Sequence, residues 1–157
     1  LNPAFCAVVL WNVAKGYRSE ATAANAAAGL LPIELAFVGA SFVLRGQTRR
    51  QLPTTVRTSL ATWIHDQPLE RSAVAKGIVI LRPYVREALL FGAKHGILSM
   101  QGRHVDGDPA AARKSARYVR QSSADVRDCV GQAGFVGRWL YRGGTVSTVL
   151  AMLGIQA

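Results

Sequence analysis

Acidic residues are scarce in this sequence of 157 residues, in which nine Asp and Glu accompany 19 Lys and Arg. The formal net charge is +10, and most of it comes from Arg because Lys occurs only at positions 15, 76, 94 and 114. An imbalance of this size favours a polyanionic partner, which is either nucleic acid or an acidic protein surface.

Cysteine and histidine are too few and too scattered for a disulfide framework or a metal site. Cys6 and Cys129 lie in apolar helical contexts, which predicts packed free thiols in a reduced, cytoplasmic protein. His65, His95 and His104 show no ligand spacing with each other or with the cysteines. We therefore predict no metal and no cofactor.

Long apolar runs are also absent. The longest one, residues 30–44, contains Pro32 and Glu34 and is shorter than the ~20 residues that a membrane-spanning helix needs. The first residues do not have the basic leader of a signal peptide. We predict no membrane segment.

Catalytic motifs are missing as well. The sequence has no nucleophile elbow, Walker loop or dinucleotide-binding fingerprint, and its carboxylates are scattered without an acid/base pair. Gly131, Gly134 and Gly137 recur at every third position, but in a predicted helix that follows no strand. Close helix packing explains these glycines better than phosphate binding. We predict a protein that is not an enzyme.

Helical periodicity is what the sequence does contain. Asn2 is a good N-cap before Pro3, and apolar residues continue to about Tyr17 on more than one stripe. This first helix should therefore be enclosed on several sides. A nearly all-apolar helix over 32–44 completes a predicted N-terminal helical pair, residues 1–44.

Residues 45–107 have the element order of a winged helix-turn-helix. A short polar helix ends near Pro53, and helices with one apolar face follow over 56–64, 70–80 and 82–94. Gly96 suits the end of the last helix, and the residues after it predict a hairpin that turns at Gln101-Gly102. We predict a mainly α fold with a small β-wing, in which this core carries N- and C-terminal helical extensions.

The remaining residues complete one predicted domain over 1–157. Residues 108–123 form a basic helix or linker, helical over 110–121, and residues 124–157 form the C-terminal helices. Ser123 and Thr145 are the expected N-caps of these helices, and Gly154 ends the last of them.

The basic segments allow two interpretations, which are contact with the DNA backbone or a surface that is solvated or paired with acids. The residues after position 110 place three arginines at i, i+4 and i+7, on one helical face. The candidate DNA contacts are Arg45, Arg49, Arg50, Arg57, Arg103, Arg113, Lys114, Arg117 and Arg120.

The helix at the recognition position carries apolar side chains away from its core stripe. Tyr84, Leu90 and Phe91 stand where a base-reading helix has Arg, Asn, Gln or Ser. Such a patch favours docking on protein, unless neighbouring helices cover it. The candidate protein-interface residues are Phe5, Trp11, Tyr84, Leu90, Phe91, Trp139 and Leu140.

Four stretches of the chain carry a resemblance to a known family. They are "LNPAFCAVVLWNVAKGY", "LPTTVRTSLATWI", "PYVREALLFGAKHGIL" and "GFVGRWLYRGGTVSTVLAMLGIQ". In this order they resemble the middle component of three-component ABC-ATPase (ABC-3C) systems, of which the Lamassu anti-phage systems are members. The resemblance weakens over residues 99–126.

The resemblance implies a complex with an SMC-like ABC ATPase and a separate effector subunit, often a nuclease. The middle component would be a scaffold and regulator that holds the effector inactive until foreign DNA, from a phage or a plasmid, is sensed. DNA contact would then occur through the complex. The rival interpretations are a stand-alone winged-helix transcriptional regulator and a cryptic hydrolase or nuclease.

Overall fold

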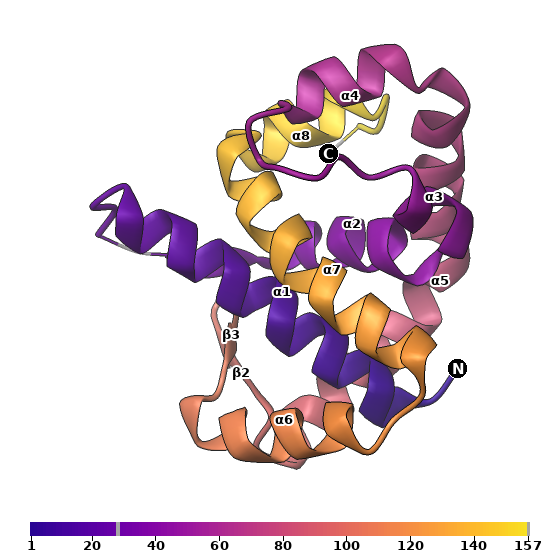
Figure 1. Cartoon of the computed structure of the whole chain (residues 1–157). Helices are drawn as coiled ribbons and strands as arrows, with labels where there is room; N and C mark the ends of the chain where they lie inside the picture. The colour runs from indigo at the N-terminus through magenta and orange to yellow at the C-terminus, as the bar shows by residue number, and fades with distance from the viewer. Residues whose placement is uncertain (28, 157) are drawn as a thin grey trace.

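The computed structural model describes residues 1–27 and 29–156; residues 28 and 157 of the predicted single domain lie outside the described part. The elements in chain order are α1 (Pro3–Ala23), β1 (Leu31–Pro32), α2 (Ile33–Leu44), α3 (Gly46–Arg50), α4 (Leu60–Asp66), α5 (Pro68–Lys94), β2 (Leu98–Gln101), β3 (His104–Gly107), the 3-10 helix η1 (Pro109–Ala111), α6 (Ala112–Arg120), α7 (Ala124–Arg142) and α8 (Val146–Met152). The fold is mainly helical with a small antiparallel sheet, as the sequence predicts (Figure 1).

Helix α1 runs through the centre of the molecule and is buried on several sides. The Asn2 side chain accepts a hydrogen bond of 2.8 Å from the Ala4 N–H, which confirms the predicted start. The helix continues past the predicted end at Tyr17, because its second half packs on α7 and an ion pair of 2.6 Å joins Glu20 to Arg142. Figure 1 shows α1 and α7 side by side. The N-terminal helices therefore do not form a separate pair, since α1 packs chiefly on α7.

The close approach of α1 and α7 depends on glycine. A Cβ atom on Gly137 would collide with the carbonyl oxygen of Val13, and one on Gly16 would collide with that of Gly134. At Gly137 the predicted role in helix packing is therefore confirmed. Gly131 is different, because a Cβ atom there would meet nothing within 4 Å.

Helix α5 is one helix of 27 residues, so the prediction of two helices over 70–80 and 82–94 was wrong. Pro83 lies inside it and cannot donate the hydrogen bond that the Val79 carbonyl would accept. Both residues are exposed, so water can satisfy that carbonyl and the helix continues. The separate helices that the sequence predicts over 70–94 are therefore absent from the structure.

The predicted hairpin is present but belongs to a larger sheet. Strands β2 and β3 pair antiparallel, and Gly102, with φ of 60°, begins the two-residue turn between them. The turn is thus one residue later than predicted. Strand β1 pairs with the other edge of β3, placing Leu31 opposite Val105 and giving the order β1-β3-β2. Because β1 precedes residue 45, the sheet extends beyond the boundaries 45–107 predicted for the winged-helix-like core.

An aromatic cluster forms the upper core in Figure 1, where α2, α4 and α7 meet. The Trp139 ring centroid lies 5.4 Å from that of Phe42 and 5.6 Å from that of Trp63. The indole N–H of Trp139 donates to the carbonyl of Thr58, and that of Trp63 donates to the carbonyl of Gln51, each at 2.8 Å. These bonds hold residues 51–59, which are not helical although the sequence predicts a helix from Val56.

The C-terminal half follows the predicted boundaries closely. The Ser123 hydroxyl accepts from the Val126 N–H at 3.3 Å, and the Thr145 hydroxyl accepts from the Thr148 N–H at 3.2 Å. Gly154, with φ of 74°, follows α8. Over residues 1–27 and 29–156, no helix has both the length and the hydropathy that crossing a membrane requires.

Candidate functional site

Four of the nine acidic side chains form ion pairs with arginines, and one of these is the pair of Glu20 and Arg142. Ion pairs join Asp106 to Arg18, Asp128 to Arg49, and Glu34 to Arg103, at 2.6, 2.7 and 2.5 Å. Among the described residues, no three His, Cys, Asp or Glu side chains are grouped so that they could hold a metal ion.

Arg49 is a structural residue and not a DNA contact. Its side chain is only 11% exposed, and it bonds to Asp128 on α7 and, at 2.7 Å, to the carbonyl of Val43 at the end of α2. The structure does not support the predicted DNA contact, because this side chain is almost wholly buried and two of its N–H donors are bonded within the fold. Arg45 is half-buried, and its Nε donates to the Thr48 hydroxyl at 3.4 Å.

Arg103 lies in the turn of the hairpin, where its side chain is 79% exposed and bonded to Glu34. Burial would raise the pKa of Glu34, but the hydrogen bond and the charge of Arg103 outweigh it and lower that pKa. Arg50 and Arg57 are exposed in and after α3. These three arginines lie outside α6, so the candidate DNA contacts are not a single surface.

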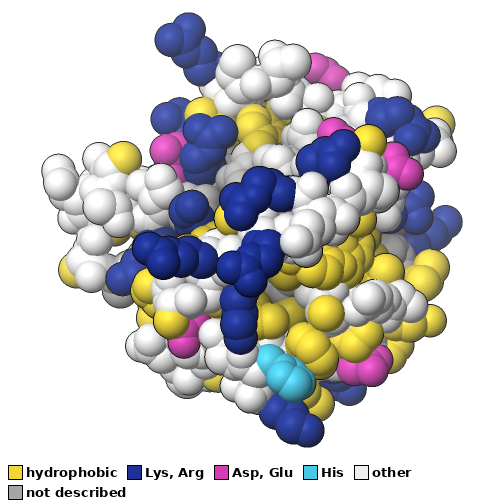
Figure 2. All heavy atoms as spheres, turned by 60° about the horizontal axis from the view of Figure 1, so that its bottom comes forward, with side chains coloured by type: hydrophobic (Ala, Val, Ile, Leu, Met, Phe, Trp, Pro, Cys, Tyr) yellow, Lys and Arg dark blue, Asp and Glu magenta, His cyan; other side chains and the backbone are white. Residues whose placement is uncertain are grey.

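Helix α6 carries the densest group of exposed cations. Arg113, Lys114, Arg117 and Arg120 are all exposed on this helix of nine residues. Lys15 of α1 and Arg120 line the same hollow beside it. In Figure 2, Lys and Arg side chains gather at the centre-left of this face, next to a broad apolar area. The predicted basic helix is thus a basic surface in the structure.

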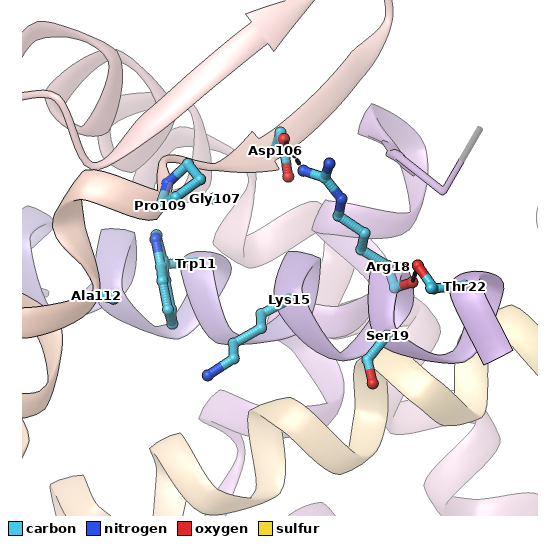
Figure 3. A pocket seen from close by; sticks show the side chains of 9 residues that line it. All are labelled: Trp11, Lys15, Arg18, Ser19, Thr22, Asp106, Gly107, Pro109 and Ala112. Carbon is cyan, nitrogen blue, oxygen red and sulfur yellow. Dashed lines mark hydrogen bonds and ion pairs between the residues drawn. The ribbon is translucent and has the colours of Figure 1, made fainter. Parts of the chain in front are cut away.

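A cavity of about 470 Å³ opens beside α1 and below β3 (Figure 3). Its wall includes Trp11, whose indole N–H donates to the carbonyl of Asp108 at 2.9 Å. The Lys15 ammonium lies 5.2 Å from the centre of the Trp11 ring, which is a cation–π contact. Arg18 reaches from the next turn of α1 to Asp106. Lys15 is thereby held at the edge of the cavity.

Three of the candidate interface residues belong to the core of the chain itself. Trp139 and Leu140 are fully buried, and Trp11 is 6% exposed. Of the two roles expected for the candidates, packing or docking, these three have the packing role: Trp139 and Leu140 offer no surface in the folded chain, and Trp11 contributes only to a cavity wall. Phe5 is half-buried, and Phe91 is half-buried with its ring 4.2 Å from that of His95.

The other two candidate protein-interface residues are exposed on the outward face of α5. Three further apolar residues, which the sequence analysis missed, are exposed there as well. Leu90 is 73% exposed and Tyr84 is 40% exposed. The missed residues are exposed on the same helix, and they are Leu69, Val79 and Ile80. The helical period of 3.6 residues could have identified them. If residues 68–94 are taken as one helix, this period places all five exposed apolar residues away from the buried stripe. We call these five residues the α5 apolar face, and the exposed side chains of Lys76, Glu87 and Lys94 lie on the same side of the helix.

Both thiols are buried and free, as the sequence predicts. Burial raises the pKa of Cys6 to about 11 and also raises that of Cys129. At pH 8 the native Cys6 thiol should therefore react with Ellman's reagent at least about 100-fold more slowly than in the denatured chain, because its reactive thiolate is rare, and Cys129 should also be slowed. Stopped-flow absorbance with and without guanidinium would measure this, and equal rates would contradict the burial.

The structure is that of a small, basic, mainly helical protein whose exposed features are a cationic helix, a cavity at α1 and the α5 apolar face. Surfaces of these kinds bind other macromolecules. The chain belongs to the family described as ABC-three component (ABC-3C) system Middle Component 3, whose model matches residues 1–157. It is therefore a component of such a system. No curated protein and no solved structure matched the chain.

Proposed function

We propose that this middle component is a non-catalytic scaffold and regulatory subunit. It links an SMC-like ABC ATPase to an effector, which is a nuclease in many such systems, within a Lamassu-type complex that defends a cell against phages and plasmids. DNA is sensed by the assembled complex. The lack of a catalytic motif in the sequence supports the non-catalytic role.

The α5 apolar face is the observation that carries this proposal. Leu69 is 85% exposed and Ile80 is 64% exposed, on a helix about 40 Å long whose opposite face is buried. The solvent side of a surface helix is normally polar, and extended apolar patches mark sites of protein contact. A subunit that is permanently bound to another protein can have such a face, because the partner covers it.

The winged-helix interpretation is retained as part of the proposal, with new boundaries. Helix α5 leads directly into the β2–β3 hairpin, and β1, from between the first two helices, pairs with β3. Winged-helix subunits dock ATPases in SMC-type complexes, which is the role that the family resemblance implies. Here α5 occupies the recognition position, and its apolar face supports protein contact over base reading.

Contact with DNA through the complex is supported by α6. Its four exposed cations can neutralise phosphates without reading bases. Binding by the isolated chain should therefore be weak, independent of sequence and strongly dependent on salt.

The proposal predicts that Leu90→Glu prevents assembly with the ATPase component. Because Leu90 is exposed, the substitution should leave the fold intact, but it places a charge in an apolar interface. A loss of about 2 kcal/mol or more, which is roughly 30-fold in affinity, is expected for a central interface residue. Co-expression followed by size-exclusion chromatography measures the loss.

Met100→Glu is the matched control, since Met100 is 39% exposed but lies on β2, outside the α5 apolar face. It should assemble as the wild type does. If Leu90→Glu and the wild type co-elute equally with the ATPase component, α5 is not the docking face. A wild-type chain that binds neither other component would contradict the scaffold role itself.

A stand-alone winged-helix regulator remains the second candidate, because Arg82 and Arg86 also lie exposed on α5 next to the hairpin. It predicts nanomolar, sequence-dependent DNA binding by the isolated chain. Fluorescence anisotropy with random and selected duplexes separates the two functions.

A further inference from the structure

A further surface hollow lies where α1 and α7 cross. A cavity of about 380 Å³ lies there, and it is lined by Asn12, Lys15 and Ser19 of α1 and by Gly131, Gly134 and Arg138 of α7. We call it the α1–α7 groove. A neighbouring hollow shares Asn12 and Lys15 and adds Arg120, so the groove continues toward α6.

Two glycines keep the floor of this groove bare. A Cβ atom on either Gly131 or Gly134 would meet nothing within 4 Å, so the fold does not require glycine for space at these positions. Glycine is nevertheless among the poorest helix formers, and both lie inside α7, which has 19 residues. Gly137 contrasts with them, because its Cβ atom would collide with α1. Bare backbone at Gly131 and Gly134 therefore favours an external group that approaches the helix closely.

The rim of the groove is positively charged. Gly131, Gly134 and Arg138 share one face of α7 at i, i+3 and i+7, and the groove is lined by one cation from each helix, Lys15 of α1 and Arg138 of α7. Within the described residues, no ion pair engages Lys15, Arg120 or Arg138. The occupant should therefore carry negative charge on both sides of a small or apolar stripe.

The geometry points to an acidic helix of another component of the system as the occupant, and this is the inference that we propose. The cations of the rim can bind phosphate as well as carboxylate, but the floor cannot bind phosphate, because the mid-helix N–H groups of the glycines are already used within α7. The nearby Trp11 offers no stacking surface either, since Lys15 covers its ring. Bare glycine floors suit the close packing of a helix, and the rim cations suit carboxylates.

This inference rests on the proposed scaffold function, and its test uses the purified complex of all three components. A photo-crosslinking amino acid is placed at Ser19 in the groove or at Ser147 on α8, both of which are exposed. We expect the Ser19 position to crosslink to a helical segment of another component that is rich in Asp and Glu. Position 147 should not reach that segment, and mass spectrometry identifies the crosslinked peptides.

Two sets of variants then separate binding from folding. Arg138→Glu should reduce the Ser19 crosslink about tenfold, whereas Arg57→Glu, with the same charge change at an exposed residue that does not line the groove, should not. The double variant Gly131→Ala and Gly134→Ala should raise the melting temperature, because alanine favours helix, yet also reduce the crosslink. A purely structural role for these glycines cannot produce that combination.

A complex that assembles without a crosslink from Ser19 overturns the groove and leaves the proposed scaffold function standing. A crosslink only to added DNA, or to a segment without an acidic excess, overturns it as well. If the three components do not assemble, the result contradicts both the proposed scaffold function and the proposed role of the groove.

Discussion

Gly137→Val is expected to destabilise the protein by more than about 3 kcal/mol, which exceeds the usual 1–3 kcal/mol cost of overpacking. Any Cβ atom at this position collides with the Val13 carbonyl oxygen and lies 2.8 Å from the backbone nitrogen of Tyr17. Because these are backbone atoms of the central helix, no side-chain rotation relieves the overlap. The helices α1 and α7 must instead move apart along their whole contact. Urea unfolding followed by tryptophan fluorescence measures the change.

Gly131→Ala is the control for this effect, since it lies in the same helix but its added methyl group meets nothing within 4 Å. It should be neutral or stabilise the chain by up to about 1 kcal/mol, as expected for glycine replaced within a helix. Equal destabilisation by the two variants would show that α1 and α7 do not cross as closely as described.

Trp139→Ala is expected to cost about 3–5 kcal/mol, a large part of the 5–15 kcal/mol that stabilises a typical domain. The side chain is fully buried between Phe42 and Trp63, so its removal leaves a cavity that rigid aromatic neighbours cannot fill. It also removes the donor that holds the carbonyl of Thr58. Denaturant midpoints and near-ultraviolet circular dichroism would record both losses.

Trp139→Phe should cost less, because it keeps most of the aromatic contact and loses the N–H bond to Thr58. The two variants also separate a core role from a docking role. If the Trp139→Ala variant keeps wild-type stability but no longer binds the ATPase component, Trp139 is an interface residue and not a core residue.

Local features were predictable from the sequence alone. The N-caps Asn2, Ser123 and Thr145 each bond to the backbone within three residues, so nothing distant decides them. The hairpin after α5 follows from alternating residues and from a glycine that accepts positive φ. The buried free thiols, the basic helix and the family also follow from patterns in the chain.

Residues of the same type have different roles in this protein, and only the tertiary structure decided which role each one has. Arg49 and Arg50 are neighbours with the same chemistry, but the first joins three helices while the second is exposed. Gly131 and Gly137 read alike in the sequence, yet one faces open space and the other touches α1. Trp139 and Leu90 are both large and apolar, but one is core and the other surface.

The physical reason is that composition and periodicity describe a helix by itself, whereas these roles depend on what packs against each face. Pro83 illustrates the same limit, because whether a proline ends a helix depends on where its unbonded carbonyl lies. The sequence thus determined that this is a basic, mainly helical middle component with an apolar surface. The packing of α1, α5 and α7 decided where that surface and the basic groove lie, since burial is a property of pairs of elements and not of one.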